Sequence, residues 1–69
     1  MTSHYAVKVG ERIRVIRIEA GVTLAELAKK TKISLGYLSD VERGKYDPTI
    51  SKVRKIASAL HVELGEICP

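Results

Sequence analysis

The segment "TLAELAKKTKISLGYLSDVERGKYDPT", residues 23–49, gives the clearest indication of the fold. Two short helical patterns lie in it, one over about residues 23–31 and the next over about residues 34–43. A single turn of chain must therefore reorient the second helix against the first. An ordinary helical hairpin has little need of so sharp a corner, so this connection is the feature that calls for an explanation.

Start and stop signals bound these two helices closely. Thr23 is followed three residues later by Glu26, a capping box in which hydroxyl and carboxylate each satisfy an otherwise unpaired backbone amide. Ser34 can cap the next helix, Gly44 ends it, and the Asp-Pro pair that follows prevents continuation. A second helix held at a steep angle by so short a turn is a helix-turn-helix, expected over about residues 23–43.

Amphipathic helices are expected on both sides of this stretch. One covers residues 6–20, and Gly21 follows where a left-handed cap is favoured. Another is capped by Thr49 and ends near His61, after which residues 62–67 form a last short turn or helix that closes the core. The apolar stripes are Val9, Ile13, Ile16 and Ala20 in the first helix, and Ile50, Val53, Ile56, Ala57 and Leu60 in the fourth.

Length and composition favour one small all-α domain. The chain has 69 residues and contains neither Phe nor Trp, so its core must be built from Ile, Val, Leu and Ala, which suits packed helices. We expect a compact bundle of four to five short helices that forms a single domain over residues 1–69. One cysteine rules out an internal disulfide, and we expect Cys68 to be chemically idle.

The charge distribution indicates an anionic partner. The formal net charge is +4, and all 12 Lys and Arg lie at or before Lys55. The remainder of the chain carries only Glu63 and Glu66, so the two ends differ in sign. A small, basic, helical chain favours nucleic acid over a membrane. Since no apolar run approaches the roughly 20 residues of a membrane span and the start lacks the layout of a secretory signal, we expect a cytoplasmic protein.

Catalytic and cofactor motifs are not recognisable. His4 and His61 have no metal-ligand spacing between them, and neither a Ser, His and Asp constellation nor a glycine-rich phosphate loop is present. So small a domain also has little room for a substrate pocket. We therefore expect no enzyme activity, no cofactor, no metal and no small-molecule substrate.

The sequence from Val9 to Ile67 resembles the DNA-binding domain of the Cro and phage-repressor class, the XRE-type family. The resemblance rests on Arg17 four residues before Gly21, and on "TLAELA", "IS", "VERGK", "DPT" and "KIASALHV" in order and at the family spacing. It implies a lambda-repressor-like fold that contains a helix-turn-helix. It also implies double-stranded DNA as the partner, with the third helix in the major groove.

The resemblance further implies which residues meet DNA. Residues on the DNA-facing side of the third helix would read bases, and residues before and after it would meet phosphates. The first set is Ser34, Leu35, Gly36, Ser39 and Asp40, and the second is Thr23, Leu24, Arg43, Lys45 and Tyr46. The family usually has Gln at position 24 and often has polar residues at positions 35 and 36, so direct base readout is expected to be impoverished.

Four residues of the third helix allow two interpretations each. Leu35 touches a thymine methyl or folds into the core, and Gly36 permits close backbone approach to DNA or has no purpose. Tyr37 bonds a phosphate, which we favour, or packs between the second and third helices. Asp40 accepts from cytosine or pairs with a nearby lysine, and we favour pairing. Charged residues on the first and fourth helices, such as Lys52, Arg54 and Lys55, are expected to be simply solvated.

One structural ion pair is expected from the same resemblance, which matches both Arg17 and Glu42. Arg17 lies on the first helix and Glu42 on the third, and a carboxylate that deep would otherwise be poorly solvated. The pair should therefore orient the third helix.

These observations favour a sequence-specific DNA-binding transcriptional regulator, most simply a repressor. So small a domain buries too little surface for tight specific binding, so a homodimer on a palindromic operator is expected. Val62, Leu64 and Ile67 should form the dimer surface because so small a core cannot cover them all, and Val15 and Ile18 on the first helix offer a competing surface. The alternative is a protein-interaction module, such as an antitoxin-like or adaptor protein with the same fold.

Overall fold

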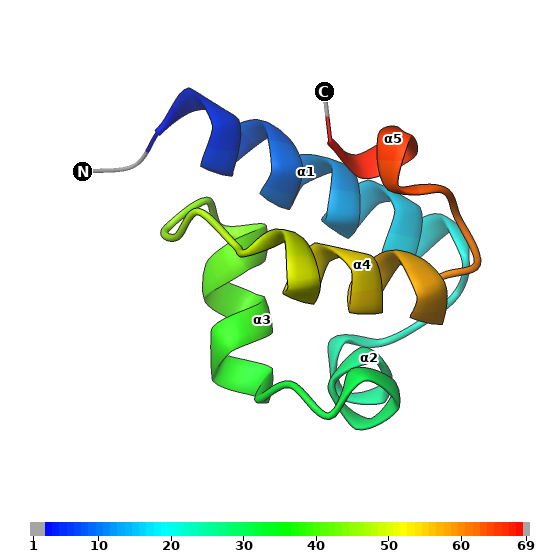
Figure 1. The fold of residues 1–69 in the computed structure, drawn as a ribbon. Coiled ribbons are helices and arrows are strands. Elements are labelled where there is room, and N and C mark those ends of the chain that lie inside the picture. The colour runs from blue at the N-terminus through cyan, green and yellow to red at the C-terminus, as the bar shows by residue number, and fades with distance from the viewer. Residues whose placement is uncertain (1–2, 69) are drawn as a thin grey trace.

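The computed structural model describes residues 3–68, and within them the chain is all-α, which confirms the expected fold class. Helix α1 (His4–Glu19) is the longest and is followed by α2 (Leu24–Thr31) and α3 (Leu35–Glu42). Helices α4 (Ile50–Ala59) and α5 (Leu64–Ile67) complete the chain (Figure 1). α1 begins earlier than expected because the Ser3 hydroxyl accepts a hydrogen bond of 3.0 Å from the Ala6 N–H.

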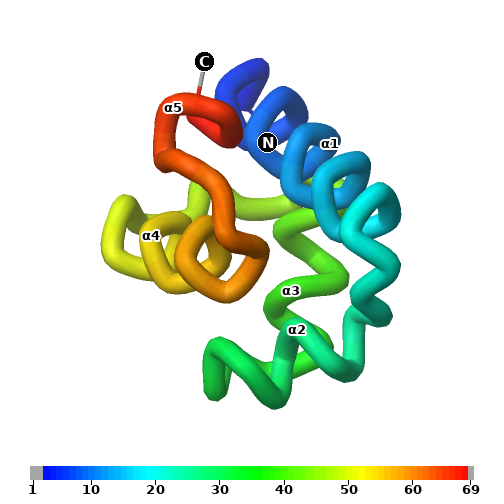
Figure 2. Tube along the Cα trace, turned by 90° about the vertical axis from the view of Figure 1, so that its right-hand side faces the viewer, coloured from blue at the N-terminus to red at the C-terminus, as the bar shows by residue number. Residues whose placement is uncertain are grey.

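The helices surround one apolar core. α1 and α4 lie on either side of α3, α2 closes one end and α5 lies beside α1 (Figures 1 and 2). The largest fully buried side chains come from all five helices, which makes the core a shared one rather than a contact between two helices. They are Val9, Ile13, Leu27, Leu38, Val41, Val53, Ile56 and Ile67.

The buried side of α1 differs from the expected stripe at both of its ends. Ala6 and Gly10 are buried, whereas Ile16 is only half-buried and Ala20 is exposed. Ala20 ends the helix, and the chain leaves the core at Gly21, whose φ of 72° is the expected left-handed conformation. Gly10 lies against α3, where a Cβ atom would stand 2.1 Å from the carbonyl oxygen of Val41. α1 and α3 therefore approach each other closely at Gly10.

The C-terminal end closes the core as a short helix, as expected, and its apolar side chains are covered more fully than the sequence predicts. Ile67 is fully buried, and Val62 and Leu64 are partly buried against the core. α5 packs onto the core through these apolar side chains, and local hydrogen bonds fix the short helix at both of its ends. The Glu63 N–H donates to Glu66 Oε2 at 2.8 Å, and the Cys68 N–H donates to the Leu64 carbonyl oxygen at 2.9 Å. The short α5 thus buries Ile67 fully and Val62 and Leu64 in part.

The exposed large apolar side chains lie elsewhere. Val7, Val15 and Ile18 form one exposed apolar side of α1, and Ile18 is 51% exposed. Tyr5 is exposed near the start of α1, and the others, Leu35, Tyr46 and Ile50, are near α3 and the start of α4. Val15 and Ile18 are the competing dimer surface expected from the sequence.

Candidate nucleic-acid interface

The start of α2 is fixed by the expected capping box. The Glu26 N–H donates to Thr23 Oγ1 at 3.0 Å, and the Thr23 N–H donates to Glu26 Oε1 at 2.8 Å. The hydrogen bond from the Thr23 backbone lowers the pKa of the exposed Glu26 carboxyl below its ordinary value. The first amides of a helix have no acceptor within it, so the N–H groups of Leu24 and Ala25 remain available to an anion.

The turn between α2 and α3 is held by a residue that the sequence analysis missed. Thr31 is buried, and its hydroxyl donates to the Leu27 carbonyl oxygen at 2.8 Å and accepts from the Ile33 N–H at 3.3 Å. Lys32 adopts a left-handed conformation with φ of 60°, and the buried Ile33 anchors the turn. α2 is seen end-on in Figure 1 while α3 runs down the page, so the two helices meet at the steep angle expected from the sequence.

The outer side of α3, which carries Ser34, Leu35, Gly36, Ser39 and Asp40, is small and partly polar. The inner side of α3 carries the buried Leu38 and Val41, and Ser34 caps the start of the helix by accepting from the Tyr37 N–H at 3.1 Å. Leu35 is 49% exposed, so it does not fold into the core. A Cβ atom on Gly36 would meet nothing within 4 Å, so packing within the protein does not require glycine there.

The rest of this outer side is joined to the loop after α3. Ser39 and Asp40 are partly exposed and Arg43 is exposed. Gly44 ends α3 with φ of 77°, which turns the Lys45 N–H back to the Asp40 carbonyl oxygen at 2.9 Å. The Lys45 ammonium lies 3.7 Å from Asp40 Oδ1, which is the favoured pairing of that carboxylate. The loop therefore brings its cations beside the outer side of α3.

The ring of Tyr37 packs toward the loop after α3, and the favoured contact of its hydroxyl with a phosphate stays a prediction. Its ring stacks on that of Tyr46, with ring centroids 5.7 Å apart and planes within 9°, and Lys52 Nζ lies 4.7 Å from the Tyr37 centroid. Burial, with a smaller contribution from Tyr46, raises the pKa of Tyr37 above its ordinary value. Lys52 is thus more than a solvated charge, since it ties α4 to this stack. Sequence spacing gives no signal of this contact, because the three residues lie on α3, a loop and α4.

The ion pair expected between α1 and α3 is present. Arg17 Nε donates to Glu42 Oε2 at 2.6 Å, and a second guanidinium nitrogen donates to Oε1 at 3.0 Å. The third nitrogen donates to the Val22 carbonyl oxygen at 2.9 Å, so one side chain joins α1, α3 and the chain before α2. The side chains are only 13% and 6% exposed. The bonds to Glu42 raise the pKa of Arg17 above its ordinary value, against the lowering effect of burial.

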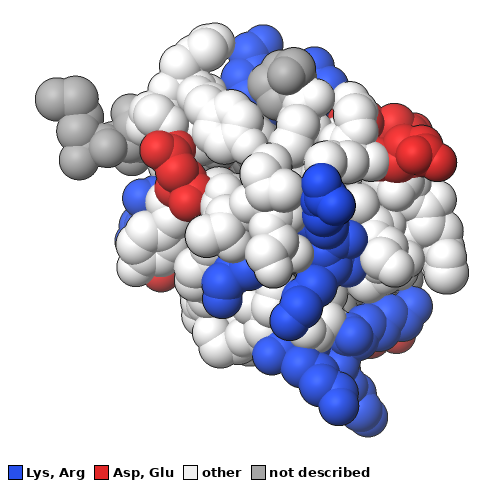
Figure 3. All heavy atoms as spheres, viewed as in Figure 1, with Lys and Arg blue, Asp and Glu red and all other residues white. Residues whose placement is uncertain are grey.

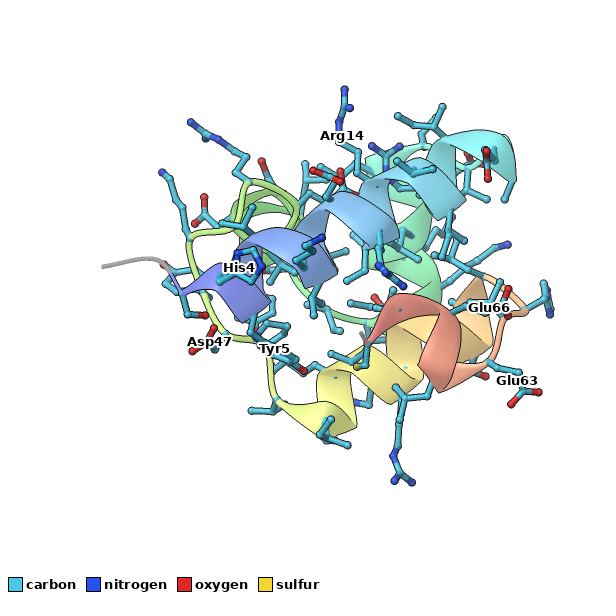
Figure 4. The ribbon with its side chains drawn as sticks, turned by 90° about the horizontal axis from the view of Figure 1, so that it is seen from above. His4, Tyr5, Arg14, Asp47, Glu63 and Glu66 are labelled. Atoms are coloured by element: carbon cyan, nitrogen blue, oxygen red, sulfur yellow. The ribbon has the colours of Figure 1, made fainter. Side chains whose placement is uncertain are left out.

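Charges are distributed unevenly over the surface. Figure 3 shows Lys and Arg side chains gathered toward the lower right of its view, over α2 and α4. Glu63 and Glu66 lie at the far end of the molecule from His4, Tyr5 and Asp47 (Figure 4). Residues 3–68 contain no cluster of three potential metal ligands. Within the same residues, no helix is both long and apolar enough to cross a membrane.

Residues 13–67 match a family model described as helix-turn-helix (HTH_3). The immunity repressor protein of Bacillus phage phi105 is 41% identical over 59 residues, which is 86% of this chain and 41% of the repressor. The chain spans roughly half the length of the curated relatives it matches.

Solved structures agree with this match. The restriction-modification controller protein C.AhdI from Aeromonas hydrophila superposes with a TM-score of 0.86 at 32% identity, over 90% of this chain and 94% of that one. The controller protein C.Esp1396I, solved as a tetramer with its natural 35 base-pair operator, gives a TM-score of 0.83 at 34% identity, over 88% and 80%.

Proposed function

Because the chain belongs to the XRE-type helix-turn-helix family of transcriptional regulators, we propose that it binds double-stranded DNA in the cytoplasm and represses transcription by occupying promoter DNA. Residues 1–69 act as one DNA-binding domain in this proposal. The observation that carries it is the outer side of α3, where Leu35, Gly36 and Ser39 are free of the core and cations of the following loop lie alongside.

Phosphate contacts supply most of the affinity. The free N–H groups at the start of α2, the Thr23 hydroxyl, and the Arg43 and Lys45 side chains suit phosphate oxygens. Leu24 is half-buried against the core, so its backbone rather than its side chain serves here. Lys45 is 52% exposed and 3.7 Å from Asp40, a loose pair that can open toward a phosphate at little cost. Stacking on Tyr37 fixes the orientation of the exposed Tyr46 ring, so that its hydroxyl can contact a phosphate beside those bound by Arg43 and Lys45.

Base contacts come from α3 in the major groove. Ser39 can hydrogen-bond several bases, and Leu35 can contact a thymine methyl. Asp40 is engaged by Lys45, so it reads cytosine only when that pair opens. The open space at Gly36 allows the backbone to approach DNA closely. Because these side chains offer few bidentate contacts, ordered water and DNA deformability provide the remaining discrimination.

The test of this function is selection of bound duplexes from a random DNA pool, followed by fluorescence anisotropy on the selected duplex over a range of salt. DNA binding predicts a palindromic selected sequence, and an affinity that falls steeply as salt rises because counterions are released. The rival function is a protein-interaction module of antitoxin or adaptor type. Recovery of no enriched sequence, together with salt-independent capture of a protein, would favour that rival.

The homodimer in this proposal uses the exposed side of α1. Val7, Val15 and Ile18 lie there with Glu11 and Arg14, and Arg14 points away from the molecule (Figure 4). Two copies related by a two-fold axis present the same side to each other, so apolar residues can meet and Glu11 can face Arg14 of the second copy. The operator-bound tetramer of C.Esp1396I is consistent with self-association.

We expect Ile18→Glu to shift the protein from dimer to monomer, because a carboxylate buried at an apolar interface loses its water at a cost that a pair with Arg14 does not fully offset. Sedimentation equilibrium of the variant and the parent measures the change in mass. Leu64→Glu is the matched control, since Leu64 is half-buried against the core. That variant should lose stability while a folded fraction keeps the parent's mass. A dimer that survives Ile18→Glu excludes α1 as the interface.

A further inference from the structure

A basic hollow lies away from the outer side of α3. It has a volume of about 530 Å³ and is open to solvent between the end of α2 and the middle of α4. Four of its lining residues are cations, namely Lys30, Lys32, Arg54 and Lys55, and the others are Thr31, Ser58 and Ala59. Cations therefore reach this hollow from two helices and from the turn after α2.

None of the four cations of the hollow forms an ion pair within residues 3–68, although Glu26 lies one helical turn before Lys30 on α2 and interacts with it. The lining of the hollow includes no Asp or Glu, and within residues 3–68 the ion pairs join only Arg17 to Glu42 and Lys45 to Asp40. Like charges that line one concave surface raise the local potential and concentrate anions there. An anion that enters also relieves their mutual repulsion.

Helix dipoles explain only part of this arrangement. Lys30 is in the last turn of α2, where a cation stabilises the partial negative charge of the helix end. Arg54 and Lys55 are in the middle of α4, and no basic residue occupies the last turn of that helix. Their position opposite α2 therefore brings no dipole benefit, and it adds repulsion.

The backbone conformation of Lys32 is a further observation that sets this hollow apart. Its φ of 60° is a left-handed conformation that glycine adopts freely and that costs other residues about 1 kcal/mol. The lysine at this position therefore adopts a backbone conformation that its side chain does not favour. His61 has a similar φ of 58° but does not line the hollow, so it provides a comparison at an unrelated turn.

We propose that the hollow between α2 and α4 is a second phosphate-binding site. Four cations and the Ser58 hydroxyl match the charge and the acceptor oxygens of two neighbouring phosphate groups. Those phosphates belong either to DNA backbone beyond the sequence read by α3 or to a free polyphosphate compound. Pyrophosphate binding at the hollow does not depend on the function proposed for α3, because the hollow lies at the opposite end of α2 from Thr23, whereas its assignment to flanking DNA rests on that function.

The test is titration of the protein with pyrophosphate, followed by two-dimensional amide NMR. We expect saturable shifts at the residues that line the hollow. Arg54→Gln with Lys55→Gln should weaken binding at least about tenfold, because half of the cations are lost. Lys32→Gly should weaken it about threefold while raising the melting temperature by roughly 4 °C, since a strained lysine is replaced by glycine.

Two controls separate the site from general effects. His61→Gly should raise the melting temperature in the same way without changing the pyrophosphate affinity. Lys8→Gln removes a cation from α1 and should also leave that affinity unchanged. Shifts that do not saturate, or a Lys8→Gln variant that loses as much affinity as the hollow variants, would overturn the proposal.

A second measurement identifies the source of the phosphates. Anisotropy compares the parent and the Arg54→Gln, Lys55→Gln variant on a selected duplex and on the same duplex extended by roughly ten base pairs, one helical turn, at each end. A loss confined to the extended duplex assigns the hollow to flanking DNA. An equal affinity of parent and variant on both duplexes, with pyrophosphate binding retained by the parent, assigns it to a free polyphosphate.

Discussion

Replacing Glu42 by alanine is expected to lower the free energy of unfolding by about 3–5 kcal/mol, which is most of the stability of a domain this small. The Arg17 side chain is only 13% exposed in the parent protein, and the substitution removes its carboxylate partner. Val22 still accepts one hydrogen bond, but a neutral carbonyl oxygen does not balance a charge. Urea denaturation followed by circular dichroism measures the loss.

Two further variants show whether the lost stability comes from an uncompensated charge. Arg17→Met combined with Glu42→Leu removes both charges and should recover much of the stability, since apolar side chains can replace a buried pair. Asp40→Ala breaks the looser pair with Lys45 and should cost less than about 1 kcal/mol because that pair is exposed. An unchanged unfolding midpoint for Glu42→Ala would show that the pair does not orient α3.

Gly10→Ala is expected to destabilise the fold by about 2 kcal/mol or more, although alanine is the better helix former. The added Cβ atom would stand 2.1 Å from the carbonyl oxygen of Val41 and 3.1 Å from that of Glu42. Both are backbone atoms, so α3 as a whole must move away from α1. That movement would also lengthen the bonds between Arg17 and Glu42 and would weaken DNA binding. Thermal unfolding measures the loss of stability.

Gly36→Ala is the matched control for this close approach. Gly36 is also helical, but an added Cβ atom there has nothing within 4 Å. Alanine should therefore raise the stability by about 0.5–1 kcal/mol. If Gly10→Ala were as stable as Gly36→Ala, then α1 and α3 would not be held at the distance described. A stable Gly36→Ala variant with weakened DNA binding would in turn support close backbone approach to DNA.

Local signals in the sequence predict the helices of this fold well. Thr23 with Glu26, Ser34, and Thr49 each begin a helix as expected, because a capping hydroxyl acts on amides only a few residues away. Gly21 and Gly44 adopt the left-handed conformation where a helix must stop. The left-handed Lys32 could not be foreseen, since nothing in its side chain favours that conformation.

Contacts between distant segments are harder to predict. The sequence shows apolar residues at Val62, Leu64 and Ile67, but whether they are covered depends on how α5 folds back, which no local pattern encodes. The stack of Tyr37 on Tyr46 likewise depends on the path of the loop after α3. The pair of Arg17 and Glu42 was foreseen only through the family resemblance, because the two residues lie 25 positions apart.

The central claim is that α3 reads DNA sequence while the loop after it holds phosphates. It is tested most directly by anisotropy of Ser39→Ala and Lys45→Ala on a selected operator and on scrambled DNA over a range of salt. Ser39→Ala should reduce the preference for the operator by roughly fivefold, about 1 kcal/mol, and leave scrambled DNA unaffected. Lys45→Ala should weaken both DNAs equally and reduce the salt slope by about 1. A Lys45→Ala variant that changes the preference between the two DNAs, or a Ser39→Ala variant that weakens both alike, would show that α3 does not lie in the major groove as proposed.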